Sequence, residues 1–311
     1  MANVYMDDEF IMLEFLTPLS DLLRSEPTFF AVMAVVFGLL VGSFLNVVIH
    51  RLPKMMDNAE NEYIKQKQAL ASGMTEEEVL NLPKPVKYNI VVPRSACPNC
   101  GHQITALENV PVISYLFLGG KCKGCKTPIS MRYPLVEALT GALIGAVAVK
   151  YGYTHTTLFA WVFVFALVAL TFIDYDTQLL PDDITLPLLW LGLLLNLNSG
   201  FVSIQSAVVG AMAGYLILWS IYWLFKLVTG KEGMGYGDFK LLAAIGAWFG
   251  WQLLPAVILL SSVVGAVIGI ALMFFKGKGR NTAIPFGPFL ALGGIAALFY
   301  GQQLSQLYLV R

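Results

Sequence analysis

Charged residues are scarce in this chain. Asp, Glu, Lys and Arg make up 13% of its 311 residues, about half of the share that is usual in soluble proteins. Apolar residues make up 57%, and the mean hydropathy is +0.69. These values exclude an ordinary soluble globular protein and indicate a membrane protein. The formal net charge is zero, so the charge balance gives no reason to expect a nucleic-acid partner.

The N-terminal end lacks the positive charge of a secretory signal peptide. Residues 1–26 hold six acids and a single base, Arg24, which is the reverse of a basic leading region. Within this tail, residues 11–23 are too few to span a bilayer and include Pro18 and Asp21. They are interpreted as an interfacial helix.

Eight apolar stretches follow, and about 20 such residues are needed to cross a bilayer as a helix. They are residues 29–49, 135–149, 158–173, 184–199, 206–229, 239–253, 254–275 and 285–300. The predicted fold class is therefore an all-α polytopic membrane protein with about eight transmembrane helices. A small cytoplasmic domain is expected between the first two.

Lys and Arg are distributed unevenly between the two sides that eight spans define. One side has three of these residues and the other has seventeen. Since basic loops remain in the cytoplasm, both termini are predicted to face outward and segment 51–133 to be cytoplasmic. The same topology puts Asp174 and Asp238 together at the cytoplasmic face.

Cysteine is rare as well, and all four cysteines lie in the cytoplasmic segment. They form two CxxC pairs, Cys97 with Cys100 and Cys122 with Cys125, with 21 residues between the pairs. Two such pairs can close a tetrahedral thiolate site, so structural zinc is predicted. Two disulfides are an alternative that the reducing cytoplasm disfavours, and a redox CxxC lacks the expected βαβ surroundings. The expected turn-forming residues are Asn99, Gly101 and Gly124.

The first part of the cytoplasmic segment, residues 55–83, is polar and rich in helix-forming residues. Thr75 and Glu78 have the spacing of a capping box, and Pro83 is expected to end the segment. It is interpreted as a solvated spacer helix.

Histidine is also scarce, and the three histidines are scattered, so no Ser–His or Cys–His pair is indicated. His50 is interpreted as a residue at an interfacial helix end. Glu137, an acid well inside an apolar stretch, is interpreted as a structural partner of nearby Arg132. Chemistry is therefore expected from other carboxylates.

Asp174 directly follows an apolar stretch and begins a loop with four acids. Its position predicts partial desolvation, which would let it hold a proton. Asp182 and Asp183 precede the next apolar stretch and are interpreted as helix N-caps, and Asp176 as a solvated loop residue.

Asp238 ends the sequence Gly-Tyr-Gly-Asp, directly before another apolar stretch. Alone, this pattern fits a helix N-cap as well as a catalyst. Gly235 and Gly237 would let a substrate strand approach the backbone closely. If Asp174 and Asp238 meet, they cannot both ionise, and the pair could activate a water molecule for attack on a peptide carbonyl.

Taken together, these segments resemble the type IV prepilin peptidases, which are bacterial inner-membrane aspartic proteases of the GxGD class. The resemblance rests on the two CxxC pairs and on residues 42–53, 108–114, 129–137, 173–182, 233–240 and 284–288.

The resemblance implies that Asp174 and Asp238 are the catalytic pair. It implies cleavage after a glycine of the basic leader of type IV prepilins and type II secretion pseudopilins, at the cytoplasmic face of the inner membrane. S-adenosylmethionine would then donate a methyl group to the new N-terminal residue. Gly120 and Lys121 resemble positions linked to methylation, and no Rossmann-type glycine fingerprint is present.

The expected organisation has five parts. These are a periplasmic tail and interfacial helix (1–27), transmembrane helix 1 (28–50), a methylation-linked cytoplasmic domain with the zinc-type site (51–133), a transmembrane peptidase domain (134–300) and a periplasmic tail (301–311).

The main alternative is a proton-coupled transporter in which the two aspartates carry protons. A zinc-stabilised sensor without catalysis is a third reading.

Overall fold

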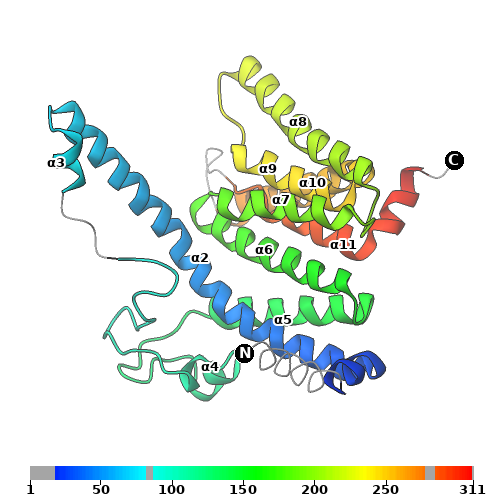
Figure 1. Ribbon diagram of the computed structural model, residues 1–311, viewed down its shortest axis with the longest axis horizontal. Helices are drawn as coiled ribbons and strands as arrows, with labels where there is room; N and C mark the ends of the chain where they lie inside the picture. The colour runs from blue at the N-terminus through cyan, green and yellow to red at the C-terminus, as the bar shows by residue number, and fades with distance from the viewer. Residues whose placement is uncertain (1–17, 82–86, 277–283, 310–311) are drawn as a thin grey trace, which may run out of the picture.

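The computed structural model describes residues 18–81, 87–276 and 284–309 (Figure 1). Residues 18–25 are helical, and the rest of the predicted interfacial helix lies outside the described residues. The longer helices are α2 (Pro27–Ala71), α5 (Arg132–Tyr151), α6 (His155–Thr177), α7 (Asp182–Asn196), α8 (Ile204–Thr229), α9 (Tyr236–Phe249), α10 (Leu254–Lys276) and α11 (Gly287–Leu309). Over the described ranges the only β pairing consists of two isolated bridges, so the all-α prediction is confirmed.

Each of the eight predicted apolar stretches is helical. Among the described residues, five helices are long and apolar enough to cross a membrane: Pro27–Ala71, Arg132–Tyr151, His155–Thr177, Ile204–Thr229 and Trp251–Leu272. The chain is therefore a membrane protein. The count of eight spans remains a prediction, because α7 and α9 have only 15 and 14 residues.

Helix α2 is longer than the sequence suggested. A transmembrane helix ending near residue 50 and a separate spacer were expected, but one helix of 45 residues continues through Pro53 to Ala71. At 1.5 Å per residue it is about 68 Å long, roughly twice the thickness of a bilayer core. The residues after Pro53 are mostly strong helix formers, which favours continuation. The far part of α2 extends beyond the bundle and carries α3 (Glu76–Leu80) at its tip (Figure 1).

The capping box predicted at the start of α3 is confirmed. Thr75 accepts a hydrogen bond from the Glu78 backbone, and the Glu78 carboxylate accepts one from the Thr75 backbone at 2.8 Å. The predicted end of this segment at Pro83 lies outside the described residues.

Helix α9 forms the centre of the bundle. Eleven of its fourteen residues are buried, and it packs against α7, α8 and α11. Glycines allow close contact with α8: a Cβ on Gly214 would lie 2.6 Å from the Leu242 carbonyl oxygen. This packing holds the first turn of α9, which carries Asp238, in a fixed position.

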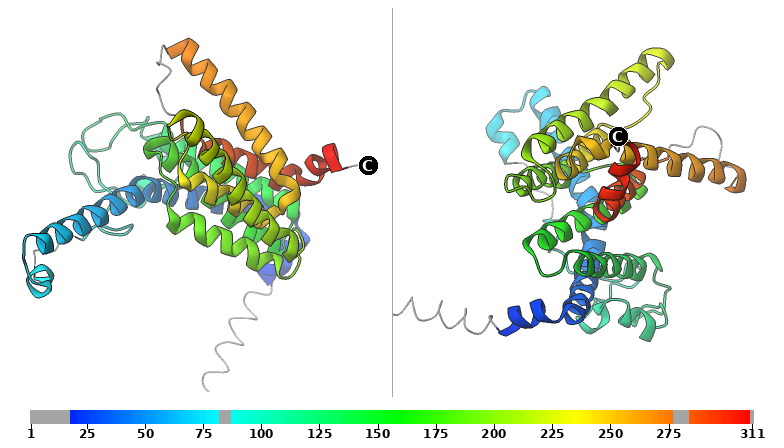
Figure 2. Two further views of the ribbon diagram at one scale, coloured as in Figure 1. Left: turned by 90° about the horizontal axis from the view of Figure 1, so that it is seen from above. Right: turned by 90° about the vertical axis from the view of Figure 1, so that its right-hand side faces the viewer.

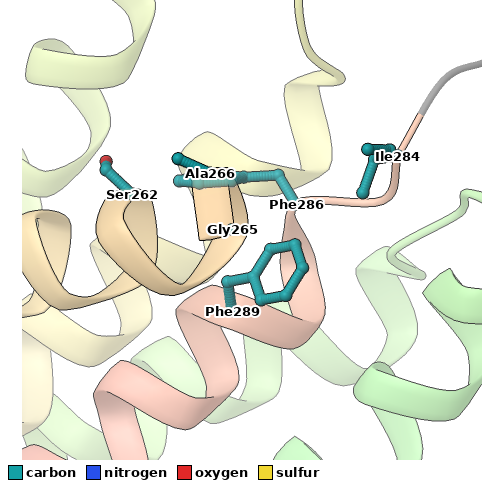
Figure 3. A pocket seen from close by; sticks show the side chains of 6 residues that line it. All are labelled: Ser262, Gly265, Ala266, Ile284, Phe286 and Phe289. Atoms are coloured by element: carbon teal, nitrogen blue, oxygen red, sulfur yellow. The ribbon is translucent and has the colours of Figure 1, made fainter. Parts of the chain in front are cut away.

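Helix α10 packs mainly against α11. Its C-terminal half points away from the other helices in both views of Figure 2. Large apolar side chains on it are exposed, among them Leu259, Val263, Val267 and Ile270. Between α10 and the start of α11 an apolar cavity of about 290 Å³ remains (Figure 3).

Candidate active site and metal centre

Asp174 lies near the C-terminal end of α6 and is only 5% exposed. Its Oδ2 accepts a hydrogen bond of 2.9 Å from the backbone N–H of Gly287, the first residue of α11. Any side chain at Gly287 would collide with it, because a Cβ there would lie 2.7 Å from Asp174 Oδ2. The positive end of the α11 dipole thus faces this carboxylate.

Asp238 lies in the first turn of α9 and is 6% exposed. The helix N-cap is Gly235, three residues earlier, so the N-cap interpretation of Asp238 is wrong. Its Oδ2 accepts a hydrogen bond of 3.2 Å from the Gly235 N–H, which is the reverse contact of a capping box. The N-cap residue thus donates its backbone N–H to the carboxylate of Asp238.

The two aspartates line one cavity of about 300 Å³. Their charges are close enough to interact electrostatically. The remaining lining residues are Gln178, Leu180, Glu232, Gly233, Met234, Gly235, Gly237, Ile284, Pro285 and Phe286. Two buried carboxyl groups in one small cavity form a site where proton sharing is favoured over double ionisation.

Both glycines predicted for substrate approach line this cavity, but they differ. A Cβ on Gly237 would lie 2.6 Å from the Cβ of Leu180, so glycine is required at this position by packing within the protein. A Cβ on Gly235 would have no neighbour closer than 4.0 Å. Gly235 therefore presents the more accessible backbone.

The acids around the cavity have other partners. Asp176 pairs with Arg132 at 2.7 Å and Asp182 pairs with Lys240 at 2.6 Å. Asp182 and Asp183 lie in the first turn of α7, whose N-cap is Pro181, so the N-cap prediction for them is wrong by one or two residues. Acids in a first turn still interact favourably with the helix dipole.

Glu137 has a different partner from the one predicted. Residues five apart on a helix point to different faces, so Arg132 turns to Asp176 while Glu137 faces the segment 87–131. The Glu137 carboxylate accepts a 2.7 Å hydrogen bond from the Val112 N–H. Val112 has φ +60°, which is strained for a β-branched residue, and Ile113 N–H bonds back to the Pro111 carbonyl in a γ-turn.

Removing the acceptor at Glu137 should release this strained turn. In Glu137→Leu the buried N–H loses a charge-assisted hydrogen bond of about 1.5–3 kcal/mol. Hydrogen exchange over residues 110–118 should accelerate by roughly tenfold or more. Glu137→Gln keeps an acceptor oxygen and is the matched control. Equal exchange in wild type and Glu137→Leu would contradict a role in holding the turn.

The four cysteines converge to one point. All four Sγ atoms lie within 4.8 Å of one another, and the Cys97–Cys125 and Cys100–Cys122 pairs are 3.8 and 3.9 Å apart. Four thiolates at 2.3 Å from a tetrahedral zinc ion would be about 3.8 Å apart. All four cysteines are free, so the disulfide alternative is excluded. The cluster has the size of a tetrahedral metal site.

The two CxxC pairs adopt the same local fold. In the first, Cys97 N–H bonds to the His102 carbonyl and Gly101 N–H bonds back to Cys97. In the second, Cys122 and Lys126 donate in the same way, to Thr127 and to Cys122. The left-handed residue follows the second cysteine in each pair, with φ +71° at Gly101 and +61° at Lys126. Gly124 lies outside this region, and a Cβ on it would lie 3.4 Å from Cys100 Sγ.

Polar neighbours favour ionised groups around the cluster. The Thr127 hydroxyl and the Asn99 amide lower the pKa of Cys125 to about 5, which supplies the thiolate that a metal needs. Glu108 accepts from the Thr105 N–H and from His102, and these contacts lower its pKa to about 2. Through these contacts, Glu108 links the turn of the first CxxC pair to the residues that lead to Val112.

Gly120 and Lys121 lie directly before the second CxxC pair, Cys122 with Cys125. Gly120 has φ +67°, and a Cβ on it would lie 2.9 Å from the Tyr115 ring, so only glycine fits. Lys121 forms an isolated bridge with Pro128. The geometry makes Gly120 a structural turn residue of the module.

Gly287 was missed from sequence, although its neighbour offers a signal. Pro288 in the second helical position is typical of a helix start, and helix starts carry free N–H groups for anions. Glu232 was also missed; it lies in the cavity wall, pairs with Lys226 at 2.8 Å and follows no pattern that marks it.

A helical membrane protein with two buried aspartates in one cavity has the construction of an intramembrane aspartic peptidase. Comparison with known proteins agrees with this class. Residues 36–151 match the family described as bacterial peptidase A24 N-terminal domain, and residues 161–270 match the type IV leader peptidase family.

Curated relatives match almost the whole chain. A prepilin leader peptidase/N-methyltransferase of Aeromonas hydrophila is 54% identical, over 94% of this chain and 98% of the relative. Proteins of the same name from Pseudomonas aeruginosa and from Burkholderia pseudomallei strain 1026b are 53% and 51% identical, over 94% and 86% of this chain and 98% and 84% of their own lengths. No solved structure matches. The chain belongs to the type IV leader peptidase family.

Proposed function

We propose that this protein is a bifunctional enzyme of prepilin maturation. It removes the leader peptide of type IV prepilins and type II secretion pseudopilins and then methylates the new N-terminus with S-adenosylmethionine. The observation that supports the peptidase function most directly is the pairing of Asp174 and Asp238, both almost fully buried, in one cavity. Relatives that share half of the residues carry both activities in their name.

In the proposed cleavage step, one aspartate is ionised and the other is protonated. The ionised carboxylate takes a proton from water as the water oxygen attacks the carbonyl carbon of the leader glycine. The protonated partner donates a hydrogen bond to the developing oxyanion. The intermediate then collapses and its C–N bond breaks, while the aspartate that took the proton from water passes it to the leaving nitrogen of the new N-terminus. Gly235 offers backbone to an extended substrate strand.

The proposed placement in the cell puts this site at the cytoplasmic face of the inner membrane, with both termini periplasmic. The basic leader of a prepilin joins an apolar helix, so its scissile bond lies at the same membrane level. The uneven distribution of Lys and Arg supports this orientation.

Zinc is the proposed ion of the four-cysteine site. The spacing of the sulfur atoms fits tetrahedral coordination by Cys97, Cys100, Cys122 and Cys125. A bound zinc ion would supply the folding free energy that a small module lacks.

Neither cavity described above is lined by residues 87–131. The assignment of Gly120 and Lys121 to methylation therefore rests on the family resemblance.

The function is tested with purified enzyme in detergent, a prepilin and mass spectrometry. We expect loss of the leader mass, and a gain of one methyl group on the mature N-terminus when S-adenosylmethionine is added. A proton-coupled transporter would leave the prepilin intact, and that result would refute the proposal.

A further inference from the structure

The second cavity in the membrane domain has no role in the chemistry described so far. It lies between Ser262, Gly265 and Ala266 of α10 and Phe289 of α11, and the segment before α11 completes it with Ile284 and Phe286 (Figure 3). Apart from the Ser262 side chain, its lining side chains are apolar. The cavity therefore suits an apolar ligand.

This apolar cavity adjoins the catalytic cavity. Ile284 and Phe286 line both. Next to Phe286, the chain begins α11 with Gly287, which donates its N–H to Asp174. A chain bound at the aspartates thus passes Phe286 to enter the space beside α10.

One cavity is polar and the other apolar. The proposed substrate differs likewise on the two sides of its scissile bond, with a basic leader before it and apolar residues after it. Among the described residues, Asp174, Asp238 and Glu232 line the catalytic cavity and not its neighbour. Glu232 also pairs with Lys226, so it is the aspartate pair that makes this cavity suit a basic leader. Among the described residues, none that lines the neighbouring cavity is ionisable. Residues that follow the scissile bond in a prepilin are apolar.

The part of α10 that lines this cavity carries small side chains, which let a bound group come close to the helix backbone. Ser262, Gly265, Ala266 and Gly269 follow the spacing i, i+3, i+4 and i+7 and so share one face of the helix. A Cβ on Gly265 would lie 3.0 Å from the Phe289 ring, so the ring occupies the space that a side chain would take. On another face, Val263 and Val267 are more than half exposed.

We infer that the cavity between α10 and α11 binds the first apolar residues after the scissile bond, and that it orients the substrate with its basic leader on the Glu232 side. This inference rests on the proposed function. A cavity of about 290 Å³ is at the lower limit for small-ligand sites, so it accepts a few side chains rather than a whole helix. A lipid acyl chain is the competing occupant.

The test compares two tryptophan variants at adjacent positions of α10. Ala266→Trp puts bulk into the open cavity that Ala266 lines, and Val267→Trp puts the same bulk on a face of α10 outside it; both positions are exposed. Each is assayed with an intact prepilin and with a leader peptide in which the residues beyond the second after the scissile bond are serine. We expect Ala266→Trp to raise KM for the prepilin at least tenfold with little change in kcat, while Val267→Trp behaves as wild type. Neither should affect the serine-substituted peptide.

Equal KM values for the prepilin in Ala266→Trp and wild type, or equal losses in both tryptophan variants, would overturn the inference. A second measurement covers the case that Ala266→Trp does not fold. A prepilin with a photoreactive group on the third residue after the scissile bond is bound to the Asp238→Asn variant. We expect cross-links to residues 262–266 or 286–289, and cross-links to lipid or to other helices would refute the site. Failure of the wild-type enzyme to cleave either substrate would instead refute the proposed function.

Discussion

Asp238→Asn is expected to reduce leader cleavage by at least about 1,000-fold, and Asp174→Asn to do the same. An asparagine has nearly the shape of an aspartate, and its amide oxygen can still accept the hydrogen bond from Gly235 or from Gly287. It cannot take up or release a proton at the active pH. The chemistry should therefore be lost while the packing of α9 and α11 is retained.

The control for these variants is Asp183→Asn. Asp183 lies in the exposed first turn of α7, in the same acidic segment as Asp174, and is not among the residues that line the catalytic cavity. Its replacement should leave cleavage within about twofold of wild type, since surface substitutions have small effects. Cleavage is measured by the mass of the prepilin product over time. Normal cleavage by either active-site variant would show that the buried pair does not perform the reaction.

The same variants separate the two activities. Methylation acts on the new N-terminus, so a prepilin that has already been cleaved bypasses the peptidase step. Asp238→Asn should methylate this mature substrate at the wild-type rate. Loss of methylation as well would mean that Asp238 supports the fold or both reactions, and it would contradict a role confined to cleavage.

The helices could be predicted from sequence because burial in lipid requires long apolar segments whose backbone groups bond within the segment. All eight stretches became helices on that basis. The length of α2 could not be predicted, because Pro53 normally marks a kink or an end. The central position of α9 could not be predicted either, since its apolar sequence is compatible with contact to lipid or to protein.

The two aspartates could be found because their positions next to apolar stretches are local features of the sequence. Their hydrogen-bond partners required the structure, above all Gly287, which is 113 residues from Asp174. Glu137 shows the limit of local reasoning. Its nearest base, Arg132, points elsewhere, and its actual partner is a backbone N–H in the strained turn at Val112.

The module of residues 87–131 should depend on the proposed zinc ion more than any other part of the protein. Between residues 87 and 131 only Pro111 and Cys122 are buried, so the module has almost no apolar core. Structural zinc contributes apparent binding free energies of about 10–16 kcal/mol in small zinc-finger peptides. Replacing Cys97 and Cys122 together by serine removes one ligand from each knuckle.

The double variant Cys97→Ser/Cys122→Ser should lose its bound zinc, measured by metal analysis of the purified protein. With the metal gone, the knuckles lose their cross-link, and hydrogen exchange across residues 95–130 should rise to the level of an unfolded chain. Ser95→Ala, an exposed change in the same module, should keep one zinc ion per chain. Unchanged metal content in the double variant would overturn the assignment of the four cysteines. Cleavage should persist, because Asp174 and Asp238 are held by α6, α9 and α11, whereas methylation should fall below detection if the module forms its site.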